Sequence, residues 1–543
     1  MFLRKKIEHA RRRSQMAELY RQAQPIDKSI APLLFWVPGG MSVLLEVEAV
    51  IATALQLRGV QSHVIICDGA YRACVLREAT SGTPVDQWQA ACQACKARTR
   101  DVLEKMRVPY SFIGDYLPDS LKDELWNATA SISWETLDDL SYGGVRLGKS
   151  TRSAIFRYLR GEEPTGHEQA VREYAFSALI SAAASSRAME KISPSRLFLS
   201  HGVYVDWGPA LQTALARGVP VAGWKPSYLY AHFYFRHIDD GVRLGFHRLT
   251  QAAWDERKAA PLSLVEEARL DEFMQHRYEE NASFDLQSVK PKAYRGEIEQ
   301  VRRTYVPHAD KPVWGVMCHI NWDSVKDYSP MAFDSFNDWI LTTVGEIVNI
   351  PEVHWLVKIH PVEANYKGLM GMQYLIDSHF PSLPPHVKVI PAEENLNPLE
   401  FFQLIDGGIS VYGTSGLELA LQGKPVILAG DAHYGGKGFT YEGLSPDAYL
   451  DLLHRAASFS RLSEEQVALA RRYAYSYFIQ REVPLPVLDQ SHTNSKLWKF
   501  QYEKRRLLLP GNDPFMDFVC RHILNGKDFV MDETLVALAK GDA

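Results

Sequence analysis

The sequence predicts an α/β fold in which two Rossmann-like domains face each other across a cleft, with additional helices. Apolar strands alternate with helices, which is typical of parallel sheets covered on both faces. Two such sets, at about 31–226 and 311–430, are separated by a polar connector. The chain has 543 residues, which is too long for a single hydrophobic core.

The first set opens at 31–69 with a strand, a Gly pair, a long apolar helix ending at Gly59 and a second strand. A helix-rich stretch follows over 87–191, and a second β–α–β unit spans 195–226. Polar sequence from about 256 to 311 has few strand signals and is interpreted as the interdomain region.

The second set begins with a strand and an aromatic-rich loop at 311–323 and continues through alternating helices and strands to 430. The sequence after about residue 462 is amphipathic and predicts helices that pack back across the first domain. The predicted division is a basic N-terminal helix (1–28), an N-terminal Rossmann-like domain with a helical insertion (29–290), a C-terminal Rossmann-like domain (311–460) and a helical tail (461–543).

The composition is that of a soluble globular protein, with 46% hydrophobic residues and a formal charge of −5. This charge gives no reason to expect nucleic-acid binding. No apolar run reaches the roughly 18–20 residues that span a bilayer, and the N-terminus lacks a secretory h-region. A cytoplasmic location is therefore expected. Residues 1–28 carry eight Lys/Arg against three Asp/Glu, which suits either a peripheral contact with the inner face of the membrane or an ordinary solvated helix.

Four of the six cysteines fall within residues 67–95. They are Cys67, Cys74, Cys92 and Cys95. The last two form CQAC, a spacing that suits zinc or redox chemistry, whereas the first two have no standard zinc spacing. Buried thiols, a structural metal or disulfide, and a redox pair all remain open.

The stretch VYGTSGLELALQGKPVILAG (411–430) has a strand–turn–helix pattern that suggests a phosphate site. A kinase-type P-loop is excluded, because Pro425 stands where Ser or Thr is required after Gly-Lys. Thr414, Ser415 and Gly416 instead begin a helix, where backbone N–H groups and hydroxyls suit a phosphate. Simple N-capping is the alternative. Glu418 is predicted to reach a ribose, with an exposed helix carboxylate as the alternative.

A second candidate cluster is Lys358 and His360, directly after a predicted strand. Parallel-sheet enzymes bind ligands at the carboxyl ends of strands, so these side chains are expected near Ser415. They could stabilise the charge on a leaving phosphate, although a single His is often structural.

Further strand-end loops supply more candidates. The loop HINWD offers Asn321 and Asp323 to the cleft. The Gly-rich loop after residue 430 could close over a sugar phosphate through His433, Tyr434, Lys437 and Thr440. Ordinary turn chemistry would also explain both loops.

In the first domain, His201 or Asp206 is the candidate base for an acceptor hydroxyl. The alternative is that neither residue is the base. Gly39 and Gly40 would allow close backbone approach at the cleft.

The block from WGVMCHINWD through VKIHPVEAN to GKGFTYE resembles the bacterial capsule and surface-polysaccharide biosynthesis family. The resemblance is densest over about 312–445 and looser at CDGAYRAC and FLSHGVYVDWGPAL. It implies a GT-B-like glycosyltransferase related to the Kdo transferases of capsule assembly, with the nucleotide sugar in the C-terminal domain and the acceptor in the N-terminal one. The family's HP motif matches His360-Pro361, its Ser/Thr turn matches Thr414-Ser415, and the ribose-binding Glu of GT-B enzymes matches Glu418.

The resemblance also implies that no catalytic metal or other cofactor is needed beyond the nucleotide-sugar co-substrate, of CMP-Kdo, UDP-sugar or GDP-sugar type. The acidic catalytic motif of the Kdo enzymes has no secure counterpart in the first domain, which leaves the donor sugar and the stereochemistry open. The expected acceptor is a glycan or lipid-linked glycan. The alternatives are a nucleotide-sugar 2-epimerase or glycerophosphotransferase of the same fold, and a non-catalytic partner in polysaccharide assembly or export.

Overall fold

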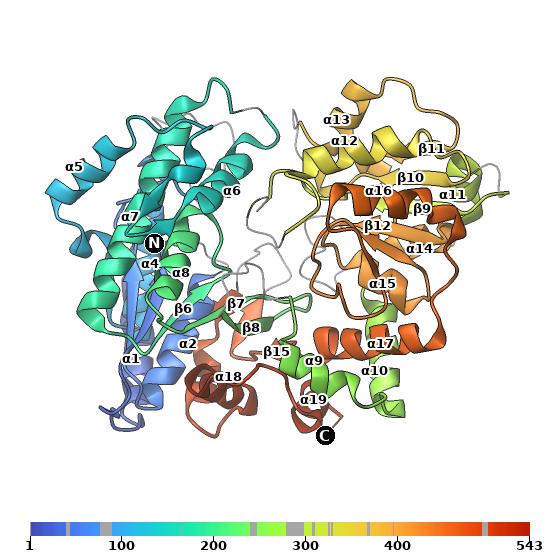
Figure 1. The fold of residues 1–543 in the computed structure, drawn as a ribbon. Coiled ribbons are helices and arrows are strands. Elements are labelled where there is room, and N and C mark those ends of the chain that lie inside the picture. Colours follow the sequence, from blue (N-terminus) through green and yellow to red (C-terminus); the bar gives the residue numbers. More distant parts are fainter. Residues whose placement is uncertain are drawn as a thin grey trace.

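A computed structural model shows two α/β domains side by side, with the end of the chain lying beneath both (Figure 1). The predicted fold class is thereby confirmed. The structure describes residues 2–39, 44–75, 89–162, 164–238, 247–278, 298–306, 310–323, 326, 330–365, 370–394, 396–490 and 498–542.

The N-terminal sheet has the strand order β15-β8-β7-β6-β1-β2-β3. From β7 to β3 neighbouring strands run parallel, whereas β8 and β15 are antiparallel to their neighbours. The strands are β1 (Leu33–Val37), β2 (Ser62–Ile66), β3 (Tyr110–Phe112), β6 (Arg196–Ser200), β7 (Val221–Pro226), β8 (His232–Ile238) and β15 (Val483–Pro484).

The C-terminal sheet has the order β11-β10-β9-β12-β13-β14, and all of its neighbouring strands are parallel. The strands are β9 (Val313–Met317), β10 (His354–Lys358), β11 (Val387–Ile390), β12 (Gly407–Ser410), β13 (Val426–Leu428) and β14 (Tyr441–Glu442). The carboxyl ends of all these strands therefore meet at one edge, where α/β proteins bind ligands.

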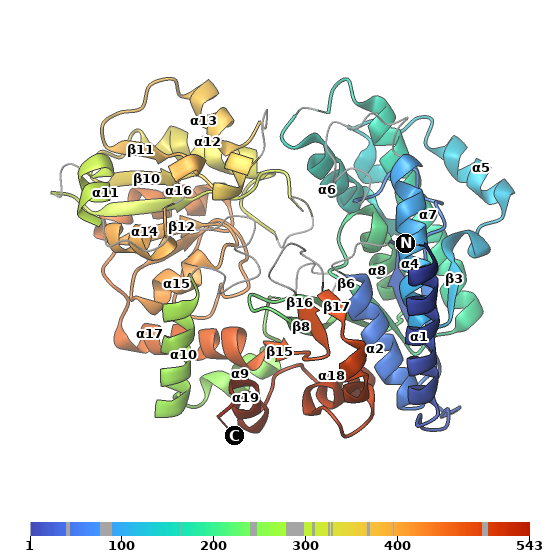
Figure 2. The same cartoon turned by 180° about the vertical axis from the view of Figure 1, so that it is seen from behind.

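Helices cover both sheets (Figures 1 and 2). Those of the N-terminal domain are α1 (Phe2–Tyr20), α2 (Leu45–Leu57), α4 (Gln89–Met106), α5 (Asp119–Ala128), α6 (Gly148–Leu159), α7 (Glu168–Ile192) and α8 (Tyr204–Ala216). Those of the connector are α9 (Gln251–Lys258), α10 (Leu264–His276) and α11 (Ile298–Tyr305). Those of the C-terminal domain are α12 (Phe336–Ile347), α13 (Met372–His379), α14 (Pro398–Leu404), α15 (Ser415–Leu421) and α16 (Pro446–His454).

The first β–α–β unit shows how the sequence encodes its elements. In α2 every residue except Glu46 and Gln56 is buried, which explains why its sequence is largely apolar. The helix ends at Arg58, and Gly59 follows with a φ of +79°. A Cβ at Gly59 would overlap the carbonyl oxygen of Pro25, so this turn requires glycine.

The basic helix α1 packs on the N-terminal domain through the buried side chains of Met16 and Leu19. Arg12 lies over the Tyr502 ring at 4.6 Å, while Arg11 and Arg13 are not buried. In the described part of the chain, no helix is both long and apolar enough to cross a membrane.

The helices α9 and α10, which the sequence placed in the first domain, pack against α17 (Glu464–Tyr475) beneath the second sheet (Figure 1). The crossing between domains therefore comes before residue 290. Amphipathic helices can cover either domain, and their sequences give no sign of which one.

The tail was predicted to be helical, and it also contains short strands that were not predicted. It contains α17, a π-helical turn (Ser476–Gln480), α18 (Pro514–Asn525) and α19 (Glu533–Lys540). It also contains β15, which extends the N-terminal sheet, and the hairpin of β16 (Leu488–Gln490) with β17 (Trp498–Phe500). A two- or three-residue strand has too short a pattern to be recognised in sequence.

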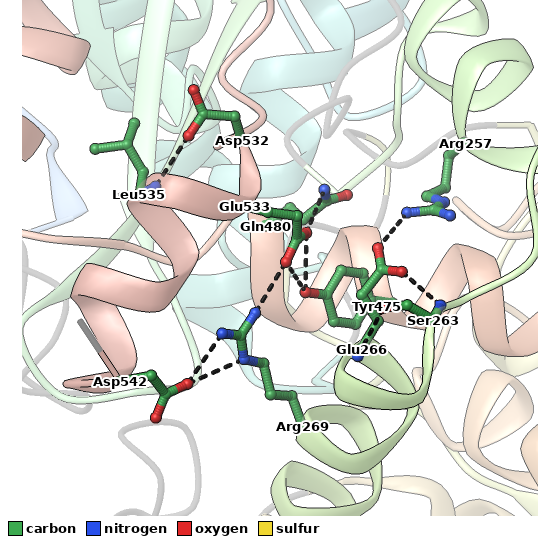
Figure 3. A network of polar contacts seen from close by, with 10 residues as sticks. All are labelled: Arg257, Ser263, Glu266, Arg269, Tyr475, Gln480, Asp532, Glu533, Leu535 and Asp542. Atoms are coloured by element: carbon green, nitrogen blue, oxygen red, sulfur yellow. Dashed lines mark hydrogen bonds and ion pairs between the residues drawn. The ribbon is translucent and has the colours of Figure 1, made fainter.

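Polar contacts fix the end of the chain to the connector (Figure 3). Arg269 of α10 forms ion pairs with Glu533 at 2.9 Å and Asp542 at 3.0 Å. The hydroxyl of Tyr475 on α17 donates to the carboxylate of Glu533. The tail thus contacts the connector, and through β15 and α17 it also contacts both domains.

Candidate functional site

A cavity of about 640 Å³ lies between the two domains. Residues of the N-terminal domain and the connector form one wall, and the strand ends of the C-terminal sheet form the other. Its polar lining residues include Lys225, His247, Arg248, Arg277, His319, Asp323, Lys358, His360, Thr414, Ser415, Asp431 and His433. Basic and imidazole groups therefore outnumber the two carboxylates, which suits an anionic ligand.

His360 follows β10 and lines this cavity, as does Lys358 at the end of that strand. The backbone N–H of Val362 donates to His360 Nδ1 over 3.2 Å, so the ring proton of the neutral imidazole is on Nε2. Burial, together with the Lys358 ammonium, lowers the pKa of His360 to about 4. Neutral His360 is therefore a hydrogen-bond donor to an anion at neutral pH.

Burial also lowers the pKa of Lys358, to about 8. The ammonium group lies 5.8 Å from the centre of the Phe401 ring. Lys358 remains largely cationic at neutral pH, so it supplies positive charge at the strand end.

The turn between β12 and α15 brings Thr414 and Ser415 to the same cavity. Thr414 precedes the helix but its side chain makes no capping hydrogen bond. Its hydroxyl instead accepts from Arg277 Nη2 at 3.4 Å. The helix α15 has only seven residues, so its dipole is short and hydroxyls and cations must carry most of any anion binding.

Gly416 is buried behind this turn. A Cβ at this position would overlap the hydroxyl of Tyr434, which donates to the Gly413 carbonyl over 2.6 Å. Gly416 thus serves packing of the turn, and it does not line the cavity.

The prediction that Glu418 reaches a ribose is contradicted. Its carboxylate is completely buried and accepts from Arg277 Nε at 3.1 Å and from the Tyr278 hydroxyl. Glu418 faces the connector because α15 packs with its first turn toward the end of α10. The spacing of residues in the sequence does not predict which way the Glu418 side chain points.

The prediction that Asp206 acts at the cleft is also contradicted. Asp206 is buried, and its carboxylate accepts from the Val75 backbone N–H at 3.2 Å. Asp206 lines a separate small cavity together with Cys67 and Cys74 of the cysteine region.

His201 is half-buried, with its ring against Trp207 at 4.5 Å. It does not line the interdomain cavity. Burial and the charge of Arg157 lower its pKa to about 3. A base of such low pKa is poorly suited to proton abstraction near neutral pH.

Asp323 joins the two domains at the cavity. Its carboxylate accepts hydrogen bonds from Arg157 of α6 and from the hydroxyl of Tyr204 at the start of α8. Tyr204 has a φ of +61°, a conformation that a non-glycine residue adopts at a cost. Asn321 does not line the cavity; its amide donates to Asn337 and to the Met370 carbonyl.

Of the four residues predicted in the Gly-rich loop, His433 lines the cavity, as does Asp431 of the same loop. Tyr434 is buried against the turn. Lys437 lies near the Trp254 ring at 5.8 Å, and Thr440 donates to Glu442. The loop folds back on α9 and α17, and Tyr434, Lys437 and Thr440 do not line the cavity.

The four cysteines Cys67, Cys74, Cys92 and Cys95 surround a separate small cavity of about 30 Å³ that Gly39 also lines. Gly40 lies outside the described residues. Among the described residues, none of the four is in a disulfide, and burial raises the pKa of Cys67 to about 11. Within the described ranges, no three His, Cys, Asp or Glu side chains are grouped as metal ligands. A structural metal at these cysteines stays a prediction. Metal analysis of the purified protein tests it.

Sequence reasoning missed the cations on the N-terminal side of the cavity. Arg277 follows α10. Lys225 lies near the end of β7, and His247 and Arg248 follow β8 in the chain. Lys225 and His247 are joined by a 2.6 Å contact between Nζ and Nε2. The sequence signal was the density of aromatic and basic residues after 225, but no motif or periodicity distinguishes it from an ordinary surface.

Part of the sequence matches a known protein family. A family model described as "Capsule polysaccharide biosynthesis protein" matches residues 227–468. No curated protein matches the sequence.

Solved structures similar to the chain include two described as KpsC of Thermosulfurimonas dismutans. One is a beta Kdo 2,4 transferase (15% identity, 58% of this chain, 87% of that chain, TM-score 0.31). The other is a beta Kdo 2,7 transferase (16% identity, 60% of this chain, 88% of that chain, TM-score 0.32). A third is a UDP-GlcNAc 2-epimerase from Neisseria meningitidis (12% identity, 83% of this chain, 98% of that chain, TM-score 0.25).

The family match begins in the segment after β7 and ends in α17, so it includes the connector, the C-terminal sheet and every residue of the turn at 413–416. Over residues 227–468 the chain is similar to the capsule polysaccharide biosynthesis family.

Proposed function

We propose that the protein is a glycosyltransferase that moves a sugar from a nucleotide-activated donor to a surface-polysaccharide or other cell-surface glycan acceptor. The observation that carries this proposal is the meeting of Lys358, His360, Thr414, Ser415 and Arg277 at one interdomain cavity. These groups come from two strand ends and the connector, and together they offer cations, a neutral N–H donor and hydroxyls.

In the proposed mechanism, the leaving nucleotide phosphate binds beside the turn at Thr414 and Ser415. Lys358 and Arg277 balance its charge, and His360 donates from Nε2 to a phosphate oxygen. We also propose that catalysis needs no divalent metal, because these side chains supply the charge; full activity in EDTA is the expected result. The acceptor would enter from the N-terminal wall, near Lys225 and His247.

A thermal-shift panel of CMP, UDP, GDP and CDP tests the nucleotide site. A ligand at one hundred times its Kd should stabilise the fold by about 2.7 kcal/mol. His360→Ala and Ser415→Ala should each remove the shift. Matched controls are His379→Ala on the exposed face of α13 and Thr440→Ala outside the cavity, which should keep it. Failure of all four nucleotides would overturn the proposal.

Product analysis separates the transferase from its relatives. Transfer of the sugar to a glycan acceptor supports the proposal. Release of an epimeric free sugar without acceptor would instead identify a nucleotide-sugar 2-epimerase, and consumption of CDP-glycerol would identify a glycerophosphotransferase.

We propose, in addition, a peripheral contact between α1 and an anionic membrane surface. Lys6, Arg11 and Arg13 are exposed on this helix, and Ile7 is 62% exposed. Exposed basic residues beside an apolar one suit a headgroup region. The intact protein should sediment with vesicles containing phosphatidylglycerol and not with pure phosphatidylcholine. Replacement of the three basic residues by Gln should abolish this difference.

A further inference from the structure

His433 lies on the wall of the cavity, and a tyrosine from the C-terminal tail fixes its ring. The Nδ1 atom of His433 is 3.0 Å from the Tyr473 hydroxyl oxygen. The same hydroxyl donates to the backbone carbonyl oxygen of His433 over 2.6 Å. Tyr473 is completely buried on α17.

These two contacts determine which nitrogen of His433 carries the proton. A phenol has one hydroxyl proton, and a carbonyl oxygen can only accept. The Tyr473 proton is therefore committed to the carbonyl, and the hydroxyl oxygen must accept from Nδ1–H. Burial and the nearby Arg481 and Arg248 lower the pKa of His433 well below its usual value. The ring is neutral, and Nε2 holds a lone pair.

Nε2 of His433 is buried and has no hydrogen-bond partner among the described residues. A buried acceptor without a partner lowers the stability of the fold, and such atoms are rare in native proteins. Among the described residues that line the cavity, one other buried side-chain atom lacks a partner, Nη1 of Arg277. One atom is an acceptor and the other is a cationic donor.

The two atoms select different parts of a ligand. A phosphate oxygen at neutral pH only accepts hydrogen bonds, so it suits Arg277 and is unfavourable beside the lone pair of His433. A sugar hydroxyl has a proton to donate and carries no charge. It therefore suits the neutral Nε2.

We propose that Nε2 of His433 accepts a hydrogen bond from a hydroxyl of the sugar bound in the cavity, and that Tyr473 is the positioning residue that holds Nε2 unprotonated. The ligand then lies with its anionic end toward Arg277 and its sugar toward His433. This inference rests on the proposed function, because it requires that the bound molecule contain a sugar.

The tautomer is tested without any ligand. Long-range ¹H–¹⁵N spectra of histidine-labelled protein, with His433→Phe for assignment, should show a neutral ring protonated on Nδ1. Tyr473→Phe should shift His433 toward the Nε2–H form. Tyr475→Phe, on the same helix but bonded to Glu533 (Figure 3), should leave the spectrum unchanged. A protonated Nε2 in the unmodified protein would overturn the tautomer assignment.

The ligand contact is tested by calorimetry with three matched pairs: CMP and CMP-Kdo, UDP and UDP-glucose, GDP and GDP-mannose. For the pair that binds, His433→Phe should weaken the sugar nucleotide by roughly tenfold and leave the nucleotide alone unchanged. His433→Gln, whose side-chain oxygen can replace Nε2, should largely restore affinity. Equal losses for both members of the pair, or no loss, would reject the sugar contact. Binding of none of the six compounds would count against the proposed function itself, while the spectra still decide the tautomer.

Discussion

Arg277 and Glu418 form a buried ion pair that joins the interdomain connector to the helix behind the candidate phosphate turn. Arg277 Nε is 3.1 Å from Glu418 Oε1, and the two side chains are 6% and 0% exposed. The Tyr278 hydroxyl donates to the other carboxylate oxygen. Since Arg277 Nη2 also reaches the Thr414 hydroxyl, this pair holds the connector directly beside the turn.

Glu418→Ala should destabilise the protein strongly. Removing one member of a buried pair leaves the other charge uncompensated, which typically costs about 3–5 kcal/mol. Urea unfolding measures the loss, and Glu465→Ala at the exposed start of α17 is the control, with an expected change within about 0.5 kcal/mol. If Glu418→Ala instead keeps full stability, the ion pair does not have this structural role.

Asp323→Asn should loosen the contact between the two domains. The substitution removes the negative charge that Arg157 and Tyr204 share. Because these side chains are partly exposed, the loss of stability should be small, about 1 kcal/mol or less. We expect small-angle scattering to show a larger radius of gyration. Asp138→Asn breaks a comparable pair with Arg152 inside the N-terminal domain and should leave the radius unchanged; the same increase in both variants would contradict an interdomain role.

Gly416→Ala should distort the phosphate turn through Tyr434. The added methyl group would overlap the Tyr434 hydroxyl, and the hydrogen bond from that hydroxyl to Gly413 would be lost. Tyr434→Phe should relieve part of the clash, so the double variant should be more stable than the sum of the two single changes predicts. Thermal unfolding of all four proteins gives the coupling. Additive effects would show that the steric conflict is not what requires glycine.

Much of the fold could be predicted because its signals are local. Apolar strands followed by helices recur in both domains, and the parallel order follows from that rhythm. The pairing of β15 with β8 could not be predicted, because a two-residue strand carries no period and its partner lies some 250 positions earlier.

The candidate site could likewise be predicted only in part from the sequence. Lys358, His360, Thr414 and Ser415 follow strand ends, and the topology brings strand ends together. The directions of Asp206 and Glu418 depend on how their helices are rotated, which residue spacing does not determine. Arg277 and Tyr473 reach the site from the connector and the tail, so only tertiary packing reveals them.

The pH dependence of nucleotide binding should follow Lys358. Burial lowers its pKa to about 8 in the free protein, so the side chain is a cation below that pH and becomes neutral above it. A bound phosphate favours the cation and raises the pKa, so affinity should be level up to about pH 8 and then fall by up to tenfold per pH unit.

Calorimetry with the nucleotide selected by the thermal-shift panel checks this between pH 7 and 10, where the nucleotide phosphates are already ionised. Lys358→Arg is the control, because a guanidinium keeps its charge over this range and should flatten the profile. Folding stability should change in the opposite direction. The unfolded chain still binds the Lys358 proton between pH 8 and 10.5 when the folded protein has released it, so this residue makes the free protein more stable as pH rises. An affinity that is level to pH 10 in the unmodified protein would place the phosphate away from Lys358.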